Sequence, residues 1–255
     1  MDTLFIGNNI VRLTEVDSTN SYARALLKDV NVHEGMVIWA DNQTNGRGQR
    51  GSVWNAEPLA NITFSLILNP GFLNATNHFH LSKIVALAIH ATLTEILGTD
   101  NYDIKIKWPN DILVNRKKIC GVLIEHIFRA DHIHQSIVGI GLNVNQVDFG
   151  ELESKATSLK LVSGKEFARD EVLSKLLKNL EVLYLQLKQG KEKEININYL
   201  KFLLYFEQET SFNDLKNNSS FKGKIVNVLP NGYLEVEFNS GERRKFDMKE
   251  VGFGY

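Results

Sequence analysis

The chain has 255 residues, of which 43% are hydrophobic and 23% are charged, and its formal net charge at pH 7 is −1. This length allows one large folded domain, or one domain with a small appendage. The near-neutral charge argues against a nucleic-acid-binding protein that works through a broad basic surface. Cys120 is the only cysteine, which excludes an intramolecular disulfide and a cysteine-rich metal site.

The start of the chain, Met-Asp-Thr-Leu-Phe, lacks the basic and apolar regions of a signal peptide. We identify no run of roughly 18 apolar residues, the length that a membrane-spanning helix needs. We therefore expect a cytoplasmic protein that does not act at a membrane.

The first predicted elements are a short strand at residues 10–13 and a helix at residues 22–28. Between them, residues 17–20 read Asp-Ser-Thr-Asn, and each of these four is a favourable N-cap. One residue is enough to cap a helix. The remaining hydroxyl and amide groups are therefore candidates for hydrogen bonds to a small polar ligand at the helix N-terminus.

A glycine-rich stretch at residues 41–54 follows the apolar run 36–40, which is typical of a buried strand. Three glycines alternate with two arginines and a glutamine in residues 46–51. Backbone N–H groups in such a loop can form an anion-binding concavity, and guanidinium groups bind phosphate or carboxylate through two hydrogen bonds. The stretch is a candidate anion-binding loop, with Trp54 as a flat surface for a ring. The alternative is a mobile surface loop with solvated arginines.

The next elements predict a sheet and a helix that covers it. Residues 61–68 alternate between apolar and polar side chains, which predicts a half-buried strand. Residues 80–97 predict a helix that is apolar around most of its circumference, ends at Gly98 and is buried against the sheet. The three histidines between residues 78 and 90 have no nearby carboxylate at metal-ligand spacing, so we expect no metal site.

Two lysines occur in an otherwise apolar segment. Residues 104–111 predict a strand that ends in a turn, and Lys105 and Lys107 share one face of this strand. Lysine is seldom buried without a partner. The pair therefore indicates either a charged partner at this face or an edge strand whose lysines lie in water.

Glycines interrupt the apolar strands that follow. Residues 112–115 and 118–128 predict a hairpin with its turn at residues 116–117. Gly121 in the second strand suggests a bulge or a close neighbour. Residues 134–145 predict another strand, and two glycines on one of its faces again suggest a close neighbour.

The C-terminal part of the sequence contains no chemical motif. Residues 169–187 predict an amphipathic helix, and residues 197–204 a short helix. Asn231-Gly232 between two strand-like segments is a strong hairpin signal. These strands predict a small barrel of about 45 residues, which would be marginal alone and so is expected to dock on the larger domain.

Five motifs together resemble the biotin protein ligase family, and they have the order and spacing of that family over roughly residues 10–145. They are Asp17-Ser-Thr-Asn20, Gln43-Thr-Asn-Gly-Arg-Gly-Gln-Arg-Gly51 with Trp54, Lys107-Trp-Pro-Asn-Asp111, Lys118-Ile-Cys-Gly-Val-Leu-Ile-Glu125 and Gly139-Ile-Gly-Leu-Asn143.

The resemblance implies an α+β fold. It implies a catalytic domain with a mixed β-sheet and flanking helices, related to class II aminoacyl-tRNA synthetases and to lipoate ligases. It also implies a small SH3-like β-barrel at the C-terminus. We place the catalytic domain at residues 1–206 and the barrel domain at residues 207–255.

The resemblance also implies a reaction. Such an enzyme activates biotin with ATP to biotinyl-5'-AMP, releases pyrophosphate, and transfers biotin to a lysine of a biotin carboxyl carrier protein. Two anions must meet, so the site needs fixed cations and Mg²⁺. The acyl-adenylate is easily hydrolysed, so a loop must exclude water. The glycine–arginine loop is the candidate for that cover.

By resemblance, each substrate has an expected set of contacts. Biotin would contact Ser18, Thr19, Asn20, Gln43, Arg47, Gly48, Gln49, Lys118 and Gly121. ATP would contact Arg50, Trp54, Asn110, Lys118 and Asn143. The expected catalytic residues are Lys118, which bridges the biotin carboxylate and the α-phosphate, Lys107 and Arg47 as further cations, and Asp111 as the base for the incoming amine.

Two features depart from a simple transfer of the family's site. The family's loop often has arginine where this chain has Gln49, and that arginine helps to retain the adenylate. Strict alternation puts Lys118 and Gly121 on opposite faces of one strand and puts Cys120 on the face of Lys118. If both Lys118 and Gly121 contact ligand, the strand bulges or one contact is through the backbone. We expect Cys120 to be a packed, structural cysteine.

The sequence also bears on the partners of the protein and leaves other functions open. Only 16 residues precede Asp17, so we expect no helix-turn-helix domain and no operator DNA binding. Residues 243–245 (Arg-Arg-Lys) are either a solvated edge or a contact for an acidic acceptor. The strand edges and glycine faces are compatible with a homodimer or with a monomer. Rival functions are a lipoate or octanoate ligase or transferase of the same fold, and a non-catalytic biotin or nucleotide sensor.

Overall fold

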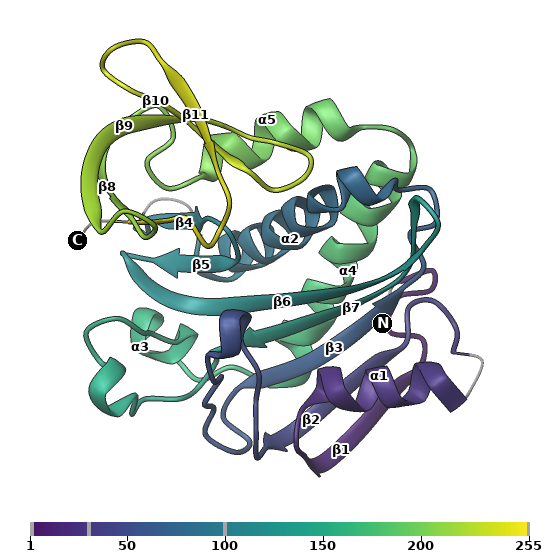
Figure 1. The fold of residues 1–255 in the computed structure, drawn as a ribbon. Helices are drawn as coiled ribbons and strands as arrows, with labels where there is room; N and C mark the ends of the chain where they lie inside the picture. Colours follow the sequence, from purple (N-terminus) through teal and green to yellow (C-terminus); the bar gives the residue numbers. More distant parts are fainter. Residues whose placement is uncertain (1–2, 30–31, 99–100, 254–255) are drawn as a thin grey trace.

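The computed structural model describes residues 3–29, 32–98 and 101–253, except for the side chains of Asp29 and Arg50. It contains two sheets (Figure 1). The larger sheet is built from β1 (Ile10–Val16), β2 (Val37–Gln43), β3 (Ile62–Leu68), β4 (Ile104–Lys107), β5 (Asp111–Val114), β6 (Lys117–Arg129) and β7 (His132–Leu142). The smaller sheet is built from β8 (Glu209–Asp214), β9 (Ser219–Val228), β10 (Leu234–Glu237), β11 (Arg243–Phe246) and β12 (Val251–Phe253).

The larger sheet is mixed, with the strand order β1-β2-β3-β7-β6-β5-β4. β1 runs parallel to β2, and the other described neighbours pair antiparallel. The helices are α1 (Thr19–Asp29), α2 (Phe79–Leu97), α3 (Leu159–Ser163), α4 (Arg169–Lys188) and α5 (Glu192–Phe202), and the 3-10 turns are η1 (Gln49–Gly51), η2 (Ala75–Asn77) and η3 (Gly150–Leu152). The expected α+β class with a mixed sheet and flanking helices is confirmed.

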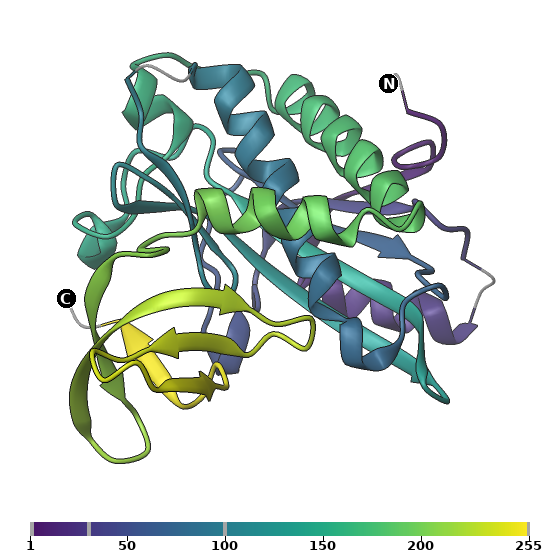
Figure 2. The same cartoon turned by 90° about the horizontal axis from the view of Figure 1, so that it is seen from above.

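Strand β3 is covered on both faces of the sheet, which changes one expectation. All seven residues of β3 are buried, although the alternation in the sequence predicted a half-buried strand. Helix α1 lies over the face that carries Thr63 and Ser65, while α2 and α4 lie on the opposite face (Figures 1 and 2). Polar residues on a covered face need hydrogen-bond partners, and the site described below provides them.

Helix α2 is the central core helix. The segment Ala75–Leu97 is long and apolar enough to cross a membrane by length and composition, which corrects the expectation that the chain has no such segment. However, 67% of its most apolar window is buried inside the fold, where α2 packs against α4 and α5. Its apolar character is explained by burial on several sides.

Several elements differ in detail from their predictions. Helix α5 begins at Glu192, where the sequence predicted a charged turn. The β5–β6 turn lies at Asn115 and Arg116, which have positive φ, rather than at residues 116–117. No pattern in the sequence predicted β8, β12 and α3, because these are short segments whose pairing or packing partners are distant in the chain.

The small sheet docks on the larger domain through its β9–β10 turn. There, Gly232 has a φ of 91° in the expected Asn-Gly turn. Trp108 donates its indole N–H to the Gly232 carbonyl at 3.0 Å, and Phe79 donates its backbone N–H to Pro230 at the same distance. We propose the domain boundary between residues 206 and 207, because the segment between α5 and β8 connects the two sheets.

Lys83 of α2 joins three elements in the core. Its side chain is fully buried, and its Nζ donates to the Asn196 side-chain oxygen on α5 at 2.6 Å and to the Val228 carbonyl at the end of β9. Burial lowers the pKa of Lys83 to about 8, because desolvation disfavours the ammonium form. The neutral amine can still donate to both oxygens.

We predict that Lys83 gives the fold a distinctive pH dependence. Its pKa is about 8 in the folded chain against an ordinary value of 10.5, so the unfolded chain binds more protons between these values. The free energy of unfolding should therefore rise with pH over this window, by at most about 1.4 kcal/mol per pH unit. Urea titrations of the native chain and of Lys83→Met at several pH values measure the difference, which should grow from pH 8 upwards.

Lys222→Met is the matched control, because the Lys222 side chain is 66% exposed. This control should run parallel to the native protein at every pH. Parallel curves for Lys83→Met and the native protein would show that Lys83 is not the source of the effect.

Candidate active site

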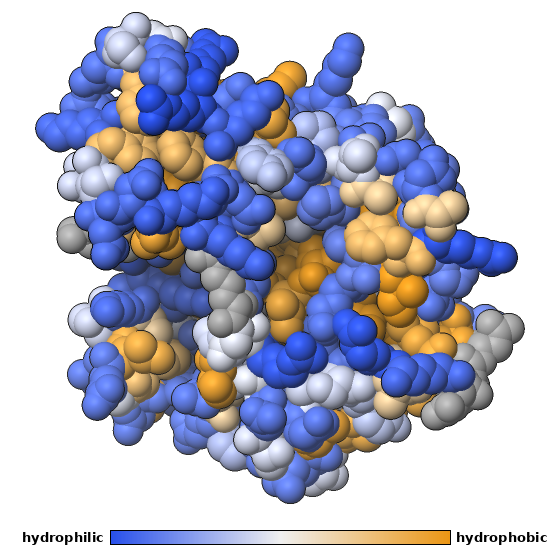
Figure 3. Space-filling model, in the orientation of Figure 1, coloured by the Kyte–Doolittle hydropathy of each residue, from blue (hydrophilic) through white to orange (hydrophobic). Residues whose placement is uncertain are grey.

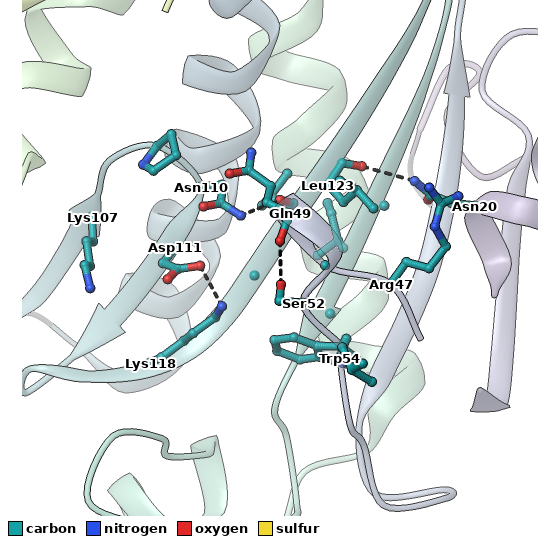
Figure 4. A pocket seen from close by; sticks show the side chains of 18 of the residues that line it. Asn20, Arg47, Gln49, Ser52, Trp54, Lys107, Asn110, Asp111, Lys118 and Leu123 are labelled. Atoms are coloured by element: carbon teal, nitrogen blue, oxygen red, sulfur yellow. Dashed lines mark hydrogen bonds and ion pairs between the residues drawn. The ribbon is translucent and has the colours of Figure 1, made fainter. Parts of the chain in front are cut away.

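A cavity of about 320 Å³ opens between the N-terminus of α1, the glycine-rich loop and the small sheet. Figure 4 shows its two ends. Asn20 and Arg47 lie at one end, which is mainly uncharged and also contains Ser18 and Thr19. Lys107, Asp111 and Lys118 lie at the other end, with Trp54 between the two ends. Figure 3 shows a hollow with apolar surface near the middle of the face of the molecule seen in Figure 1.

The floor of the cavity is a single register row that crosses the sheet. Thr63 of β3 pairs with Gly141 of β7, which pairs with Gly121 of β6. The row continues to Asp111 of β5 and Lys107 of β4. Register partners point to the same face of a sheet, so this pairing places a carboxylate and an ammonium group beside two glycines, which have no side chains.

The two glycines of β7 each lie under a specific neighbour. A Cβ on Gly139 would clash with the side-chain oxygen of Asn20 and would lie 3.0 Å from its Cγ. A Cβ on Gly141 would lie 2.6 Å from the Trp54 indole nitrogen. The expectation of a close neighbour on this glycine face is therefore confirmed, and the neighbours are a polar amide and an aromatic ring.

A β-bulge brings Lys118 and Gly121 to the same cavity. Ile112 pairs with Cys120, but the next residue, Leu113, pairs with Lys118, so Ile119 is an extra residue. The Lys118 Nζ lies only 3.2 Å from the position that a Cβ on Gly121 would take. The bulge is one of the two outcomes that strict alternation required.

The same bulge corrects the prediction that Cys120 shares the face of Lys118. Cys120 instead points into the core, where it is fully buried. Burial raises the pKa of its thiol far above the ordinary value, so the thiolate form that would react is suppressed. A structural role for Cys120 is consistent with this environment.

The charged end of the cavity contains a close ion pair. The Nζ of Lys118 lies 2.7 Å from the Asp111 carboxylate and 5.5 Å from the centroid of the Trp54 ring. Lys107 lies in β4, which is the edge strand of the sheet, and its Nζ is 5.7 Å from the Phe253 ring. Asn110 donates its side-chain amide to the Val122 carbonyl at 2.8 Å. An anionic ligand here would meet two ammonium groups and one carboxylate.

The glycine-rich loop is folded back on itself. Gly48 donates to the Ser52 carbonyl at 2.7 Å, and Trp54 donates to Gly46 at 2.9 Å. A Cβ on Gly46 would clash with the carbonyl of Trp54, so the turn requires glycine there. These backbone bonds favour an ordered cover over the alternative of a mobile loop, and they hold Trp54 over the glycine floor.

Most of the residues expected at the site line this one cavity: Ser18, Thr19, Asn20, Gln43, Arg47, Gly48, Gln49, Trp54, Lys107, Asn110, Asp111, Lys118 and Gly121. Asn143 does not line it. It is buried, and its side-chain amide donates to the Thr157 carbonyl at 3.0 Å, while its side-chain oxygen has no hydrogen-bond partner in the described structure. The side chain of Arg50 lies outside the described part of the structure.

The sequence did not indicate that the C-terminal domain contributes to the cavity. Met248, Val251, Gly252 and Phe253 line it, and they come from β12 and the segment before it. These residues carry no recognisable motif, and only the docking of the small sheet brings them to the site. Two residues near the uncharged end, Ser65 and Glu125, were also not assigned a role.

We predict that Gly141→Ala displaces the Trp54 indole, since the new methyl group would overlap the ring. Trp39 and Trp108 are 2% and 3% exposed. The variant should therefore show a larger fraction of tryptophan fluorescence that acrylamide quenches, and Trp54→Leu in the same background should remove this extra fraction. Gly71→Ala is the control because nothing lies within 4 Å of its added Cβ. Unchanged quenching in Gly141→Ala would contradict the close contact.

Comparison with known proteins finds relatives that are named as ligases. The chain is 32% identical over 248 residues to the bifunctional ligase/repressor BirA of Bacillus subtilis, covering 96% of this chain and 74% of that protein. It is 30% identical over 176 residues to a biotin–[acetyl-CoA-carboxylase] ligase of Mycobacterium tuberculosis, covering 68% of this chain and 63% of that one.

A solved structure also matches. The biotin protein ligase from Aquifex aeolicus in complex with biotin and ATP has a TM-score of 0.78 and 32% identity, covering 96% of this chain and 98% of that chain. The family model for the biotin/lipoate A/B protein ligase family matches residues 13–143. This match covers the α1 N-terminus, the glycine-rich loop, the bulged strand β6 and the glycine face of β7, and the chain belongs to the biotin/lipoate A/B protein ligase family.

Proposed function

We propose that this chain is an ATP-dependent biotin protein ligase. It activates biotin to biotinyl-5'-AMP and transfers biotin to a lysine of a biotin carboxyl carrier protein. The observation that carries the proposal is the two-ended cavity, in which Trp54 lies between a polar end with Asn20 and Arg47 and the Lys107, Asp111 and Lys118 end. The relatives named for biotin, and the Aquifex aeolicus structure with biotin and ATP, support this choice.

The first step requires two anions to approach each other. The biotin carboxylate oxygen attacks the α-phosphorus of ATP, the bond to the β-phosphate oxygen breaks, and pyrophosphate leaves. Lys118 lies beside both the glycine floor and Asp111, so its ammonium group can stabilise the negative charge that gathers at the α-phosphate. Lys107 and Arg47 lie at opposite ends of the cavity. Lys107 would hold the phosphates, and Arg47 would hold biotin.

The second step needs an uncharged amine. An acceptor lysine must lose a proton before its nitrogen attacks the carbonyl carbon of the adenylate and AMP leaves. Asp111 is the carboxylate on the floor row, and its side chain is 21% exposed. When Lys118 turns toward the phosphate, the Asp111 oxygen is released to accept the proton of the incoming amine.

Magnesium would enter with the triphosphate. Among the residues that the structure describes, no cluster of three or more histidine, cysteine, aspartate or glutamate side chains could hold a metal ion. Mg²⁺ commonly uses one or two carboxylates together with substrate phosphates, and Asp111 provides such a carboxylate in the cavity. The ion would neutralise the phosphate charge, while Lys118 and Asp111 position the reacting groups.

We predict that biotin-dependent pyrophosphate release from ATP fails in Lys118→Met. The loss should be on the order of 100-fold or more, as for removal of one group that stabilises the transition state. Lys117→Met is the matched control, because Lys117 is exposed and bonds the Glu153 carbonyl away from the cavity. Biotin transfer to a carrier domain, with and without ATP, completes the assay.

The same assay separates the rival functions. Pyrophosphate release with lipoate or octanoate but not with biotin would identify a ligase of the alternative kind. Binding of biotin without pyrophosphate release would identify a sensor. Equal loss in Lys117→Met and Lys118→Met would mean that the chemistry does not depend on the cavity.

The proposed partner is the carrier domain of a biotin-dependent carboxylase, and the proposed location is the cytoplasm. We propose no role in DNA binding, because a net charge of −1 gives no broad basic surface. Two of the three basic residues at 243–245 form ion pairs within the small sheet, Arg243 with Glu237 and Arg244 with Glu242. These ion pairs favour the interpretation of residues 243–245 as a solvated edge over a contact for an acidic acceptor. A sequence-specific mobility shift at physiological salt, or recovery of the protein with membranes, would contradict these assignments.

A homodimer is proposed at the open edge of β6. The β5–β6 pairing ends where Asp111 meets Gly121, and β6 continues to Arg129 with β7 on its other side. Open edges favour pairing with another strand, and Phe128 on this segment is 51% exposed. We predict that sedimentation velocity detects a dimer that Phe128→Glu weakens, since a two-fold interface would bring the new charges together. A native chain that stays monomeric at all concentrations would contradict this.

A further inference from the structure

Glu125 lies behind the uncharged end of the cavity. It belongs to β6, and its carboxylate accepts a hydrogen bond from the Asn20 side-chain amide at 2.9 Å. The same carboxylate lies 2.7 Å from the Arg24 guanidinium and 3.5 Å from that of Arg47. Its side chain is only 16% exposed, so these partners largely replace water around the charge.

The carboxylate fixes the orientation of the Asn20 amide. A carboxylate only accepts hydrogen bonds, and the second neighbour of the Asn20 nitrogen is also an acceptor, the Leu123 carbonyl at 3.3 Å. The NH₂ group of Asn20 therefore faces Glu125, and its oxygen faces Ser65 at 2.6 Å. Because that oxygen can only accept, the single Ser65 proton must be donated to it.

The orientation is then passed on to the wall of the cavity. Ser65 is fully buried, and its oxygen lies 2.8 Å from the Thr19 hydroxyl oxygen. The only proton left for that contact belongs to Thr19. The other neighbour of the Thr19 hydroxyl group is the Gln43 side-chain oxygen at 3.1 Å, which is also an acceptor. With either partner, the Thr19 proton points into the network, and a Thr19 lone pair is left for the cavity.

Gln43 completes a wall of defined polarity. Its side-chain oxygen accepts from the Thr19 backbone N–H at 2.8 Å, so its amide nitrogen is left to donate. The wall therefore offers an N–H donor beside a hydroxyl acceptor. This order is complementary to a cyclic urea, in which a carbonyl acceptor adjoins an N–H donor.

We propose that Glu125 is a positioning residue that sets the donor and acceptor polarity of the biotin end of the cavity through Asn20, Ser65 and Thr19. The inference rests on the proposed function, because it takes the ureido ring of biotin as the group recognised. Glutamine at position 125 would offer both a donor and an acceptor. Asn20 could then turn, the Ser65 proton would be released, and Thr19 would no longer be confined to accepting.

The test is a double-mutant cycle on biotin affinity, measured by calorimetry on the full chain without ATP. Glu125→Gln and Ser65→Ala should each weaken biotin binding about tenfold, the change expected when one hydrogen bond to the ligand is lost. The double variant should bind no more weakly than the weaker single variant, because both changes interrupt one chain of hydrogen bonds. The KM for ATP should stay within about twofold of the native value, which a general loss of structure would not allow.

Glu15→Gln is the matched control. Glu15 accepts from the Asn42 side-chain amide at 2.8 Å, so the control makes the same carboxylate-to-amide change beside an asparagine outside the cavity. It should leave biotin affinity unchanged. Thermal unfolding of every variant identifies any chain that does not fold, and if Glu125→Gln is such a chain, Ser65→Ala decides the question.

Two results would overturn the inference. One is biotin affinity that stays native in Glu125→Gln or in Ser65→Ala. The other is a double variant whose loss equals the product of the single losses, since Glu125 would then act only through the arginines. A native chain that does not bind biotin would instead refute the proposed function, so the two failures are distinguishable.

Discussion

The register of the larger sheet is the constraint on which the rest of the site depends. One row, Thr63, Gly141, Gly121, Asp111 and Lys107, combines a bare floor with two charged groups from four hydrogen-bonded pairings. A slip of one residue would send every side chain of a strand to the opposite face. The site is therefore specified by backbone pairing before any ligand is bound.

The bulge at Ile119 adapts this register to chemistry. Without the extra residue, Lys118 would point to the same face as Cys120 and into the apolar core, where a charged amine is costly. With it, Cys120 fills the core and Lys118 reaches Asp111. Bulges often re-aim a side chain next to an active site, and here one residue separates a core position from a reactive one.

The uncharged end depends on a different principle, the satisfaction of buried polar groups. Ser65, Asn20 and Thr19 are all buried, and their hydrogen bonds run to Gln43 at one end and to Glu125 at the other. In a low-dielectric interior, an unpaired member would be costly, so such a network is stable in few proton arrangements. Rigidity of this kind gives a ligand pocket fixed donors and acceptors before the ligand arrives.

The small sheet is part of the catalytic structure as well as an appendage. Lys83 and Trp108 bond carbonyls of its β9–β10 hairpin, while Phe253 of β12 reaches the cavity near Lys107. A contact that holds the hairpin therefore also fixes the wall that β12 provides. Loosening this docking would alter the cavity without changing any residue on the larger sheet.

The local chemistry of the site could be predicted from residue types alone. The glycine-rich loop, the four capping residues 17–20, the lysines around residues 107–118 and the glycines of β7 could all be identified because their residue types carry local meaning. The main helices and the Asn231-Gly232 hairpin also followed from periodicity and turn chemistry, whereas the α+β class was implied by the family resemblance.

Tertiary structure alone decided how these pieces meet. The bulge that moves Lys118 away from Cys120 depends on pairing with β5, and the burial of β3 on both faces depends on α1. Asn143, a predicted nucleotide contact, donates its side-chain amide to the Thr157 carbonyl, 14 residues further along the chain. Met248, Val251, Gly252 and Phe253 join the cavity only through docking of the small sheet. Local sequence specifies which groups are present, but long-range pairing and packing choose their partners, because those contacts join residues that are distant in the chain.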